Sequence, residues 1–401
     1  MSASSPPSEP LAEDPGLRVL HVFGGLEVGG AETWLSTALA HGGLRAAYSH
    51  DFCLLSSSEG PLAAELRRRG HRVLHVPLVP RWSFPQRLFS FLRRRRYDAV
   101  HSHVLLFSGV TLAVARAAGI RLRIAHAHND SDGRASSWTR GLYRRGMRRL
   151  IAWASTDVVG CTRRAALAAG GTERTLRVLP YGVALADSDA PRPSPGRAAL
   201  LDSCDLPPDA RVWGHIGRMA PQKNQRFLLE AFAAAYHADA CSYLVIAGEG
   251  PLRSGLEAYA EGLGVADRVR FLGLRRDAGA LLDALFDVLV LPSLHEGLPV
   301  VLLEAQAAGL PCLISDAVNP DTVVLEEQVQ SLPLSAGFTA WSEAAQRLSL
   351  RPRIDGRVAA QRLRRARFDA GQSWERLLAL YQPERDRSGD APLQPVAGVS
   401  P

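Results

Sequence analysis

Two glutamates stand at either end of a short predicted helix and could bind two parts of one ligand. Segment 287–316 reads DVLVLPSLHEGLPVVLLEAQAAGLPCLISD, in which a buried strand precedes a loop with Glu296 and a helix with Glu304. Pro299 lies where a first-turn proline is favoured. If the span were helical, the glutamate backbones would lie about 12 Å apart, beyond the roughly 5–9.5 Å of a hydrolytic carboxylate pair. The spacing favours a role for the two glutamates in binding two parts of an elongated ligand. An isolated pair of glutamates at this spacing is, however, more often two solvated charges at the ends of a helix.

A second loop places two cations beside the start of a helix. Segment 214–232, GHIGRMAPQKNQRFLLEAF, carries Arg218 and Lys223 after a predicted strand, with Asn224 placed to cap the next helix. Lys223 is the only lysine among the 47 lysine and arginine residues of the chain. Cations at the carboxyl edge of a parallel sheet, next to free helix amides, form a site for a pyrophosphate group.

A glycine-rich turn, FGGLEVGGAET at 23–33, joins the first predicted strand to a helix. It is not a dinucleotide fingerprint, because Glu27 stands where the second glycine would be. It is not a P-loop either, because Gly30 and Ala31 replace the lysine and the hydroxyl residue. By itself the turn predicts a tight strand–helix connection.

Two His-x-His pairs, His101/His103 and His126/His128, follow the period of a strand, so each pair lies on one strand face. Such pairs suggest a metal site, but no Asp or Cys follows at ligand spacing, and we expect no metal. Two Asp-x-Asp triplets, at 130–132 and 187–189, have the form of a metal-binding signature, and we attribute them to chance.

Short apolar strands alternate with helical segments along most of the chain, which predicts an α/β protein with parallel sheets covered by helices on both faces. A Pro-, Ser- and Asp-rich stretch interrupts the alternation once, so we expect two doubly wound, Rossmann-like domains facing a cleft. The predicted parts are a disordered leader (1–16), an N-terminal domain (17–185), a linker (186–209), a C-terminal domain (210–370), a helix crossing back to the first domain (371–384) and a disordered tail (385–401).

The motifs resemble those of the retaining glycosyltransferases of family 4, which have the GT-B architecture. PS-x-x-EGLP…EA matches the family at residues 292–305, and G-R-x-x-x-x-K-N matches its diphosphate loop. The resemblance implies that Glu296 contacts hydroxyl groups of the donor sugar and that Glu304 holds the ribose. Arg218 and Lys223 would clamp the donor diphosphate. By the same resemblance, the domain at 17–185 would bind the acceptor and the domain at 210–370 the nucleotide sugar.

The remaining site residues follow from the same resemblance. The G-G-x-E turn of the family packs against the diphosphate, which implicates Gly29 and Gly30 in donor binding. The backbone of Gly297 and Leu298 would orient the sugar. RIAHAHND is similar to the exopolysaccharide branch, whose active-site histidine matches His128; His126 would be structural. The sequence departs from the family at Tyr181, where Asn is usual, and we expect little effect.

These residues predict a retaining transfer of a hexose from a nucleotide-diphosphate sugar, with uridine favoured by the branch alone. The acceptor would be a glycan or a lipid-linked sugar in surface polysaccharide synthesis. No cofactor or metal is expected, because Arg218 and Lys223 can neutralise the departing diphosphate. A nucleotide-sugar isomerase or epimerase on the same fold is an alternative, but we see no carboxylate pair suited to it. An Arg-rich nucleic-acid-binding protein is a weaker one, since aromatics are not interleaved with the basic residues.

The chain has a net charge of +7. Because it contains no apolar run of about 20 residues, we expect no membrane spans. The first residues lack the pattern of a secretory signal, and five scattered cysteines fit a reducing compartment, so we expect a cytoplasmic protein. Arginine clusters in the first domain predict peripheral attachment to the anionic inner face of the cell membrane. They lie at 67–69, 93–96, 144–145 and 148–149, and the apolar residues before the second are Trp82, Phe84, Leu88, Phe89, Phe91 and Leu92.

Overall fold

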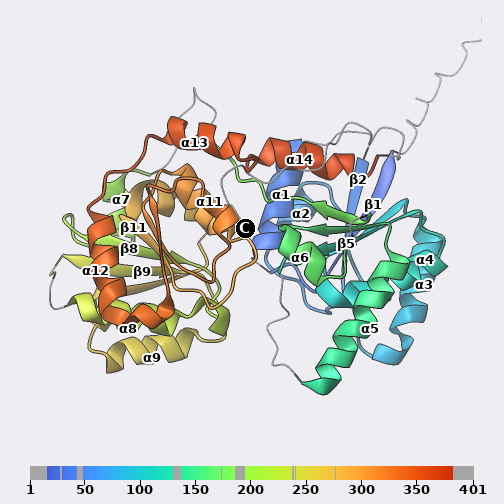
Figure 1. Ribbon diagram of the computed structural model, residues 1–401, viewed down its shortest axis with the longest axis horizontal. Coiled ribbons are helices and arrows are strands. Elements are labelled where there is room, and N and C mark those ends of the chain that lie inside the picture. Colours follow the sequence, from blue (N-terminus) through green and yellow to red (C-terminus); the bar gives the residue numbers. More distant parts are fainter. Residues whose placement is uncertain are drawn as a thin grey trace, which may run out of the picture.

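The computed structural model describes residues 16–27, 29–42, 48–129, 137–172, 174–185, 195–236, 239, 241–275 and 277–382. The predicted leader up to residue 15, the predicted tail and both Asp-x-Asp triplets lie outside these residues. The described chain forms two separate parallel sheets flanked by helices, which Figure 1 shows side by side. The expected α/β architecture with two doubly wound halves is confirmed.

The N-terminal half is built on a seven-stranded sheet with the order β3-β2-β1-β4-β5-β6-β7, in which neighbouring strands run parallel. Apolar and β-branched runs form its centre, because strands covered on both faces favour such residues. The strands are β1 (Leu17–Phe23), β2 (Tyr48–Leu54), β3 (Val73–His75), β4 (Ala99–Ser102), β5 (Leu122–Ala127), β6 (Asp157–Gly160) and β7 (Leu176–Val178).

Helices cover both faces of this sheet, and α4 lies between α3 and α5. Alternate residues of β4 point to opposite faces. His101 therefore reaches Tyr381, just beyond α14, whereas Ser102 bonds Ser108 of α4 at 3.0 Å. The helices are α1 (Gly30–Gly42), α2 (Leu62–Arg68), α3 (Phe84–Arg95), α4 (Ser108–Ala117), α5 (Trp138–Ala154), α6 (Arg163–Ala168) and α14 (Ala370–Ala379).

The C-terminal half repeats the plan on a six-stranded parallel sheet with the order β10-β9-β8-β11-β12-β13. Its strands are β8 (Arg211–Ile216), β9 (Ser242–Ala247), β10 (Val269–Gly273), β11 (Val288–Leu291), β12 (Cys312–Ser315) and β13 (Val329–Leu332). Its helices are α7 (Arg197–Ser203), α8 (Gln225–Tyr236), α9 (Arg253–Gly262), α10 (Ala278–Ala280), α11 (Val300–Ala307), α12 (Gly337–Ser349) and α13 (Gly356–Arg365).

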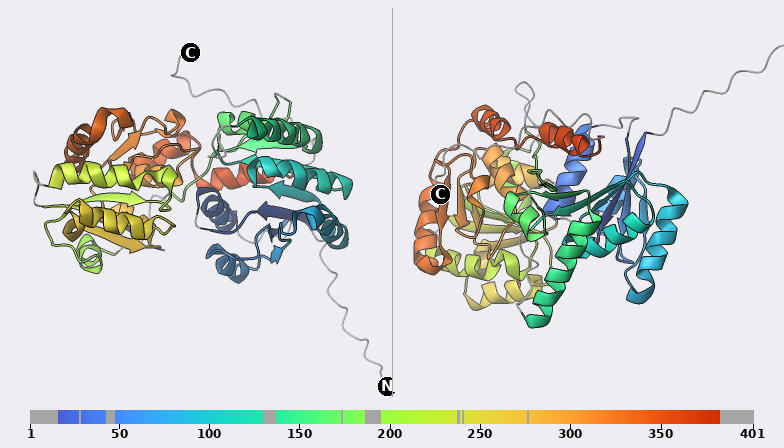
Figure 2. Two further views of the ribbon diagram at one scale, coloured as in Figure 1. Left: turned by 90° about the horizontal axis from the view of Figure 1, so that it is seen from below. Right: turned by 45° about the vertical axis from the view of Figure 1, so that its right-hand side comes forward.

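The chain passes between the halves twice, and the two crossings lie side by side. Val183 donates its amide to the carbonyl of Phe368 at 2.9 Å, and Ala370 donates to the carbonyl of Val183 at 3.0 Å. Beyond the second crossing, α14 packs against α1 of the N-terminal half, as Figures 1 and 2 show. α14 (Ala370–Ala379) overlaps the segment 371–384 for which the sequence predicts a returning helix and begins one residue before it.

Part of the predicted linker is not a connection but the helix α7. Leu200 and Leu201 of this helix are buried together with Leu281 and Leu285 in the C-terminal half. The surrounding Pro, Ser and Asp residues suggested a linker, yet a short apolar run within them is enough to bury one helix face. The connection is therefore shorter than the predicted range 186–209.

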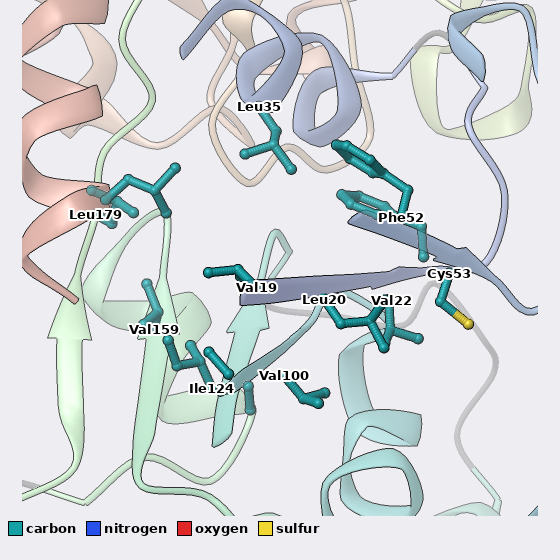
Figure 3. Packing of buried hydrophobic residues seen from close by; sticks show 14 of the residues in the cluster. Val19, Leu20, Val22, Leu35, Phe52, Cys53, Val100, Ile124, Val159 and Leu179 are labelled. Atoms are coloured by element: carbon teal, nitrogen blue, oxygen red, sulfur yellow. The ribbon is translucent and has the colours of Figure 1, made fainter. Parts of the chain in front are cut away.

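The core of the N-terminal half contains the residues that the sequence marks as apolar strands. Figure 3 shows Val19 and Val22 of β1 among Phe52 of β2, Leu35 of α1 and Ile124 of β5, and all of them are buried. Four of the five cysteines are buried and all are free thiols, in line with their interpretation as core residues. Among the described residues, no helix has the length and apolar character needed to cross a membrane.

Candidate active site

The cation loop and the glutamate loop meet at the carboxyl edge of the second sheet. The neighbouring strands β8 and β11 lead into the loops that carry Lys223 and Glu296. Lys223 Nζ lies 2.6 Å from Glu296 Oε1, and the two side chains are only 18% and 6% exposed. Each charge offsets the cost of burying the other. Two residues predicted separately thus form one ion pair.

Neighbouring polar groups fix the orientation of the Glu296 carboxylate. Ser293 Oγ donates a hydrogen bond of 2.7 Å to Glu296 Oε1. Ser315, at the end of β12, donates to the carbonyl of Ser293 at 2.6 Å. Gln222 Nε2 donates to the carbonyl of His295 at 2.9 Å and lies 3.5 Å from Glu296 Oε2. The carboxylate therefore has one oxygen bound to Lys223 and Ser293.

Arg218 differs from Lys223 because its side chain is exposed. Among the described residues, its guanidinium forms no hydrogen bond or ion pair, while its carbonyl accepts a bond of 2.9 Å from Gln225 Nε2. Asn224, expected to cap the next helix, donates its side-chain amide to the carbonyl of Pro292 at 3.1 Å instead. It has a left-handed backbone (φ 54°) and ties the cation loop to the glutamate loop.

Helix α11 begins later than expected. It starts at Val300 with Pro299 as its N-cap, so residues 296–299 are not helical. The expected distance of about 12 Å between Glu296 and Glu304 assumed a helix throughout and does not apply. Glu304 is half-buried on α11, while Glu296 lies in the preceding loop.

The two halves touch where the predicted site residues of both gather. A Cβ placed on Gly297 would lie 2.3 Å from the carbonyl oxygen of His128, so only glycine allows this approach. A Cβ on Gly30, the first residue of α1, would lie 3.6 Å from Val300 of α11. Figure 1 shows α1 and α11 facing each other between the halves. We call this contact region, formed by Gly30, His128, Gly297 and Val300, the junction.

Glu32 lies beside the junction and was not among the predicted site residues. A Cβ on Gly29 would lie 2.6 Å from its carboxylate, which places Glu32 against the glycine turn. Burial raises the pKa of Glu32 to about 7, and the charge of Arg218 across the junction opposes this shift. Its signal was present in the sequence, because Glu32 is the acidic residue of the G-G-x-E turn.

His128 is held on both sides by hydrogen bonds. Its Nε2 lies 2.8 Å from Nδ1 of His103, and its Nδ1 is hydrogen-bonded to the hydroxyl of Tyr181. Burial lowers the pKa of His128 to about 3, so the ring is neutral. Tyr181, whose departure from the family was expected to matter little, is thus a direct partner of His128. It also stacks on Trp34, with ring centroids 5.0 Å apart.

Comparisons with known proteins identify the family. Residues 29–182 match the family described as "Glycosyl transferase 4-like domain", and residues 210–349 match "Glycosyl transferases group 1". The chain is 32% identical over 378 residues to EpsF of Bacillus subtilis (strain 168), whose name places it among the glycosyltransferases; the match covers 91% of this chain and 96% of EpsF. The chain belongs to glycosyltransferase family 4.

Further relatives and solved structures agree with this assignment. The chain is 29% identical over 252 residues to the Escherichia coli enzyme named UDP-Gal:alpha-D-GlcNAc-diphosphoundecaprenol alpha-1,3-galactosyltransferase, covering 60% of this chain and 63% of that one. The structure of HepE from Anabaena, solved with UDP and glucose, superposes with a TM-score of 0.73 at 18% identity, covering 90% and 98% of the two chains. This glycosyltransferase thus has the GT-B fold.

The His-x-His pairs of this glycosyltransferase come together in space, although we expected no metal site because no Asp or Cys follows them at ligand spacing. Two groups, His21/His101/His103 and His103/His126/His128, have ligand atoms within 4.8 Å of one another. Most of their nitrogens are joined in pairs by hydrogen bonds, for example His21 Nδ1 to His103 Nε2 at 3.1 Å, whereas Nε2 of His126 has no partner among the described residues. A lone pair that accepts such a bond is not available to a metal ion.

Proposed function

We propose that this glycosyltransferase transfers a hexose, with retention of anomeric configuration, from a UDP-sugar to a lipid-linked or glycan acceptor in surface polysaccharide synthesis. Support for the donor comes from HepE, solved with UDP and glucose, and from the Escherichia coli relative named for UDP-Gal. The same relative is named for a diphosphoundecaprenol-linked acceptor, and a second is named for capsular polysaccharide biosynthesis. Retention is the stereochemistry implied by the family resemblance.

The contact between Lys223 and Glu296 is the observation that best supports the proposal. It brings the cation loop and the glutamate loop to one edge of the sheet, and Gly297, which follows Glu296, approaches His128 at the junction. In the proposed reaction, Arg218 and Lys223 stabilise negative charge on the departing nucleotide diphosphate. Glu296 and the backbone of Gly297 hold the sugar. This arrangement puts cations at the leaving group and a carboxylate at the hydroxyl groups.

The remaining residues have supporting roles. Glu304 anchors the ribose of the donor, and the glycine turn at Gly29 and Gly30 approaches the diphosphate from the other half. Leu298 contributes its backbone amide beside that of Gly297. The bond from the anomeric carbon to the diphosphate breaks as the bond to the acceptor oxygen forms on the same face. The proton of the acceptor hydroxyl passes to an oxygen of the departing phosphate, so no protein base is needed.

A donor screen followed by product analysis tests this function. UDP-, GDP- and ADP-sugars are compared by thermal shift, and the UDP-sugar is expected to raise Tm most, because donor binding stabilises the fold by mass action. Transfer to a lipid-diphosphate-linked sugar should then give a product with the anomeric configuration of the donor, and it should survive EDTA. Conversion of the donor to an epimer without acceptor would instead support the isomerase alternative. Loss of activity in EDTA that Mn²⁺ restores would contradict the metal-free mechanism.

We further propose that the N-terminal half binds the anionic inner face of the cell membrane, with α5 as the contact. Trp138, Leu142 and Trp153 on this helix are 82%, 60% and 56% exposed, and Arg145 and Arg149 are exposed beside them. One end of α5 projects from the sheet in Figure 1. Apolar burial together with arginine contacts to anionic lipids gives reversible attachment.

The structure corrects the surface that the sequence suggested for this attachment. Phe84, Leu88 and Leu92 of α3 are buried in the core, so they are not available to a bilayer; Trp82 and Phe89 are exposed. Within the first arginine cluster, Arg67 and Arg69 pair with Glu59 and Glu65. α5 therefore replaces α3 as the main apolar contribution.

A further inference from the structure

Buried histidines form two hydrogen-bonded lines on the face of the first sheet that α1 and α14 cover. In the long line each ring nitrogen meets one nitrogen of the next ring, at 3.0, 3.1 and 2.8 Å in the order His50, His21, His103, His128, and the line ends at Tyr181. The short line has contacts of 3.1 and 2.7 Å in the order His126, His101, Tyr381.

All six imidazoles are neutral at pH 7. Burial lowers the pKa of His50 and His128 to about 3, and it lowers the pKa of His21, His101, His103 and His126 well below 6.5. A neutral imidazole has one N–H and one lone pair. In each line, Nδ1 of one ring faces Nε2 of the next ring. If every such contact is a hydrogen bond, the nitrogen that carries the proton in one ring determines which nitrogen carries it in every other ring. Only two arrangements exist, with all protons on Nδ1 or all on Nε2.

The free end of the long line distinguishes these arrangements. Among the described residues, Nε2 of His50 and Nε2 of His126 are buried and have no hydrogen-bond partner. In the long line, protons on Nε2 would bury the N–H of His50 without an acceptor. Protons on Nδ1 would leave only a lone pair there, and the Tyr181 hydroxyl, which then accepts from His128, can donate its own proton to Cys161. An orphaned buried N–H is rarer than an unused lone pair. Among the described residues, either arrangement of the short line leaves one donor without an acceptor, the N–H of His126 or the hydroxyl of Tyr381.

Trp374 of α14 favours the same arrangement. Its ring centroid lies 5.8 Å from that of His50, and its indole N–H is also buried without an acceptor in the described part of the chain. A donor beside His50 is better tolerated by a lone pair on that ring than by a second N–H.

We propose that every imidazole of the long line carries its proton on Nδ1, and that this line fixes His128 in this single tautomer at the junction. His103 is then a positioning residue, because its Nδ1–H donates to His128 Nε2. His128 Nδ1–H in turn donates to Tyr181. The role in transfer rests on the proposed function, in which His128 faces the donor sugar from the N-terminal half.

This assignment limits what His128 can do. Both of its nitrogens are occupied within the protein, so it neither takes the proton of the acceptor nor protonates the leaving group. It contributes a fixed ring and a fixed carbonyl, against which Gly297 packs. The line thus holds His128 in one tautomer and one orientation, so that its ring forms a rigid part of the proposed sugar site.

The first test reads the tautomers directly. The full chain labelled with ¹⁵N-histidine is studied by long-range ¹H–¹⁵N correlation without any substrate, and resonances are assigned by single substitutions. The protonated nitrogen of His128 and of His103 should be Nδ1, unchanged between pH 8 and pH 6.5. A proton on Nε2 of His128, or a stoichiometric metal ion in the purified protein by elemental analysis, would overturn the proposal.

Two variants of His103 separate positioning from packing. His103→Phe keeps the ring, which stacks on Phe23 with centroids 4.2 Å apart, but removes the N–H donor. His103→Asn loses the ring, yet its amide can occupy the place of Nδ1–H. We expect His103→Phe to lower kcat roughly 10-fold, the effect of one lost hydrogen bond, and to mix the tautomers of His128, while His103→Asn retains more activity. The reverse order of activities, with the His128 tautomer unchanged in both, would show a role in packing alone.

The control is His75→Phe, at a histidine of the same sheet that bonds Ser56 and Glu59 outside both lines. It should leave kcat and the His128 tautomer unchanged. UDP binding by calorimetry should also be unaffected in every variant, because the cation loop is in the other half. The tautomer spectrum needs no turnover, so an enzyme inactive with all UDP-sugars would contradict the proposed function while the tautomer assignment is still tested.

Discussion

Gly297 is the residue at which one methyl group would alter the contact between the halves. In Gly297→Ala, the added Cβ would lie 2.3 Å from the His128 carbonyl oxygen and 3.0 Å from Asn129 Oδ1. The halves must then move apart, and we expect transfer to fall on the order of 100-fold, as for other misplacements of about 1 Å near reacting groups. Steady-state kinetics measure the loss, with thermal unfolding as the check on folding.

Gly255→Ala is the matched control for this change. Gly255 lies in α9 of the same half, and an added Cβ would meet nothing within 4 Å. Alanine there should leave transfer unchanged and stabilise the helix slightly. If Gly297→Ala is as active as Gly255→Ala, the junction is not in its catalytic arrangement here.

The two cations of the donor site can be tested against an arginine outside it. Lys223→Ala and Arg218→Ala should each lower turnover about 100-fold or more, the scale of removing one positioned donor from an anionic transition state. Arg268→Ala, which removes a cation–π contact with Tyr236 away from both loops, should have little effect. Near-normal rates for the first two with a UDP-sugar would show that the diphosphate binds elsewhere.

At the residue scale, the sequence predicted the pieces of the site better than their contacts. Lys223 and Glu296 could be found because each lies in a short motif beside a strand and a helix. Their ion pair could not, because it depends on β8 and β11 becoming neighbours. Tyr181 was undervalued for the same reason: its partner, His128, is far from it in sequence and comes close only through the fold.

Among the elements, the central strands of the first sheet carry histidines that make folding sensitive to acid. Their pKa values in the folded state are lowered by burial, whereas an unfolded histidine titrates near 6.5. The unfolded chain therefore binds more protons below pH 6.5, so stability falls as pH falls. Each such histidine contributes up to about 1.4 kcal/mol per pH unit.

We therefore expect Tm to change little between pH 8 and pH 7 and to fall steeply between pH 6.5 and pH 5. Denaturant unfolding at several pH values measures the slope. Replacing His126, at the free end of the short line, by Gln should reduce the slope by about one proton. A Tm that is constant down to pH 5 would show that these histidines are already accessible to protons in the folded chain.

Most helices and strands could be predicted from the sequence, and the exceptions have physical causes. Strands such as β1 and β11 are continuous apolar runs, which is the pattern that two-sided burial demands. α7 was missed because proline and aspartate around it outweighed a short apolar run. The late start of α11 at Val300 was missed because Pro299 fits an N-cap as well as a first turn.

At the scale of the whole molecule, the proposed membrane surface can be tested with vesicles. The full chain should bind anionic vesicles but not zwitterionic ones, and salt should weaken binding by screening the arginines. Replacing Trp138, Leu142 and Trp153 of α5 by Ser should reduce sedimentation with vesicles and leave activity on a water-soluble acceptor intact. Replacing the exposed Val358 of α13, in the other half, is the control. Equal binding to neutral and anionic vesicles, or none to either, would contradict the proposal.

The return of the chain to its N-terminal half has a consequence for the order in which the two halves fold during synthesis. Trp34 donates to Ser373 at 2.8 Å, and His101 bonds Tyr381 at 2.7 Å, so the N-terminal half is closed by the last described residues. The C-terminal half is in effect an insertion within it. At about 5–20 residues per second, a ribosome needs roughly 20–70 s to travel from β1 to α14.

During that interval the first sheet lacks α14, the helix that covers its histidines. The strands and helices of the C-terminal half, in contrast, have all been synthesised before α14. We therefore expect the later-made half to fold first. A chain ending at Asp369 should show a native C-terminal half and a protease-sensitive N-terminal half in pulse proteolysis, and a fused or added peptide of residues 370–382 should restore protection. Full protease protection of the truncated chain would show that the N-terminal half folds without residues 370–382.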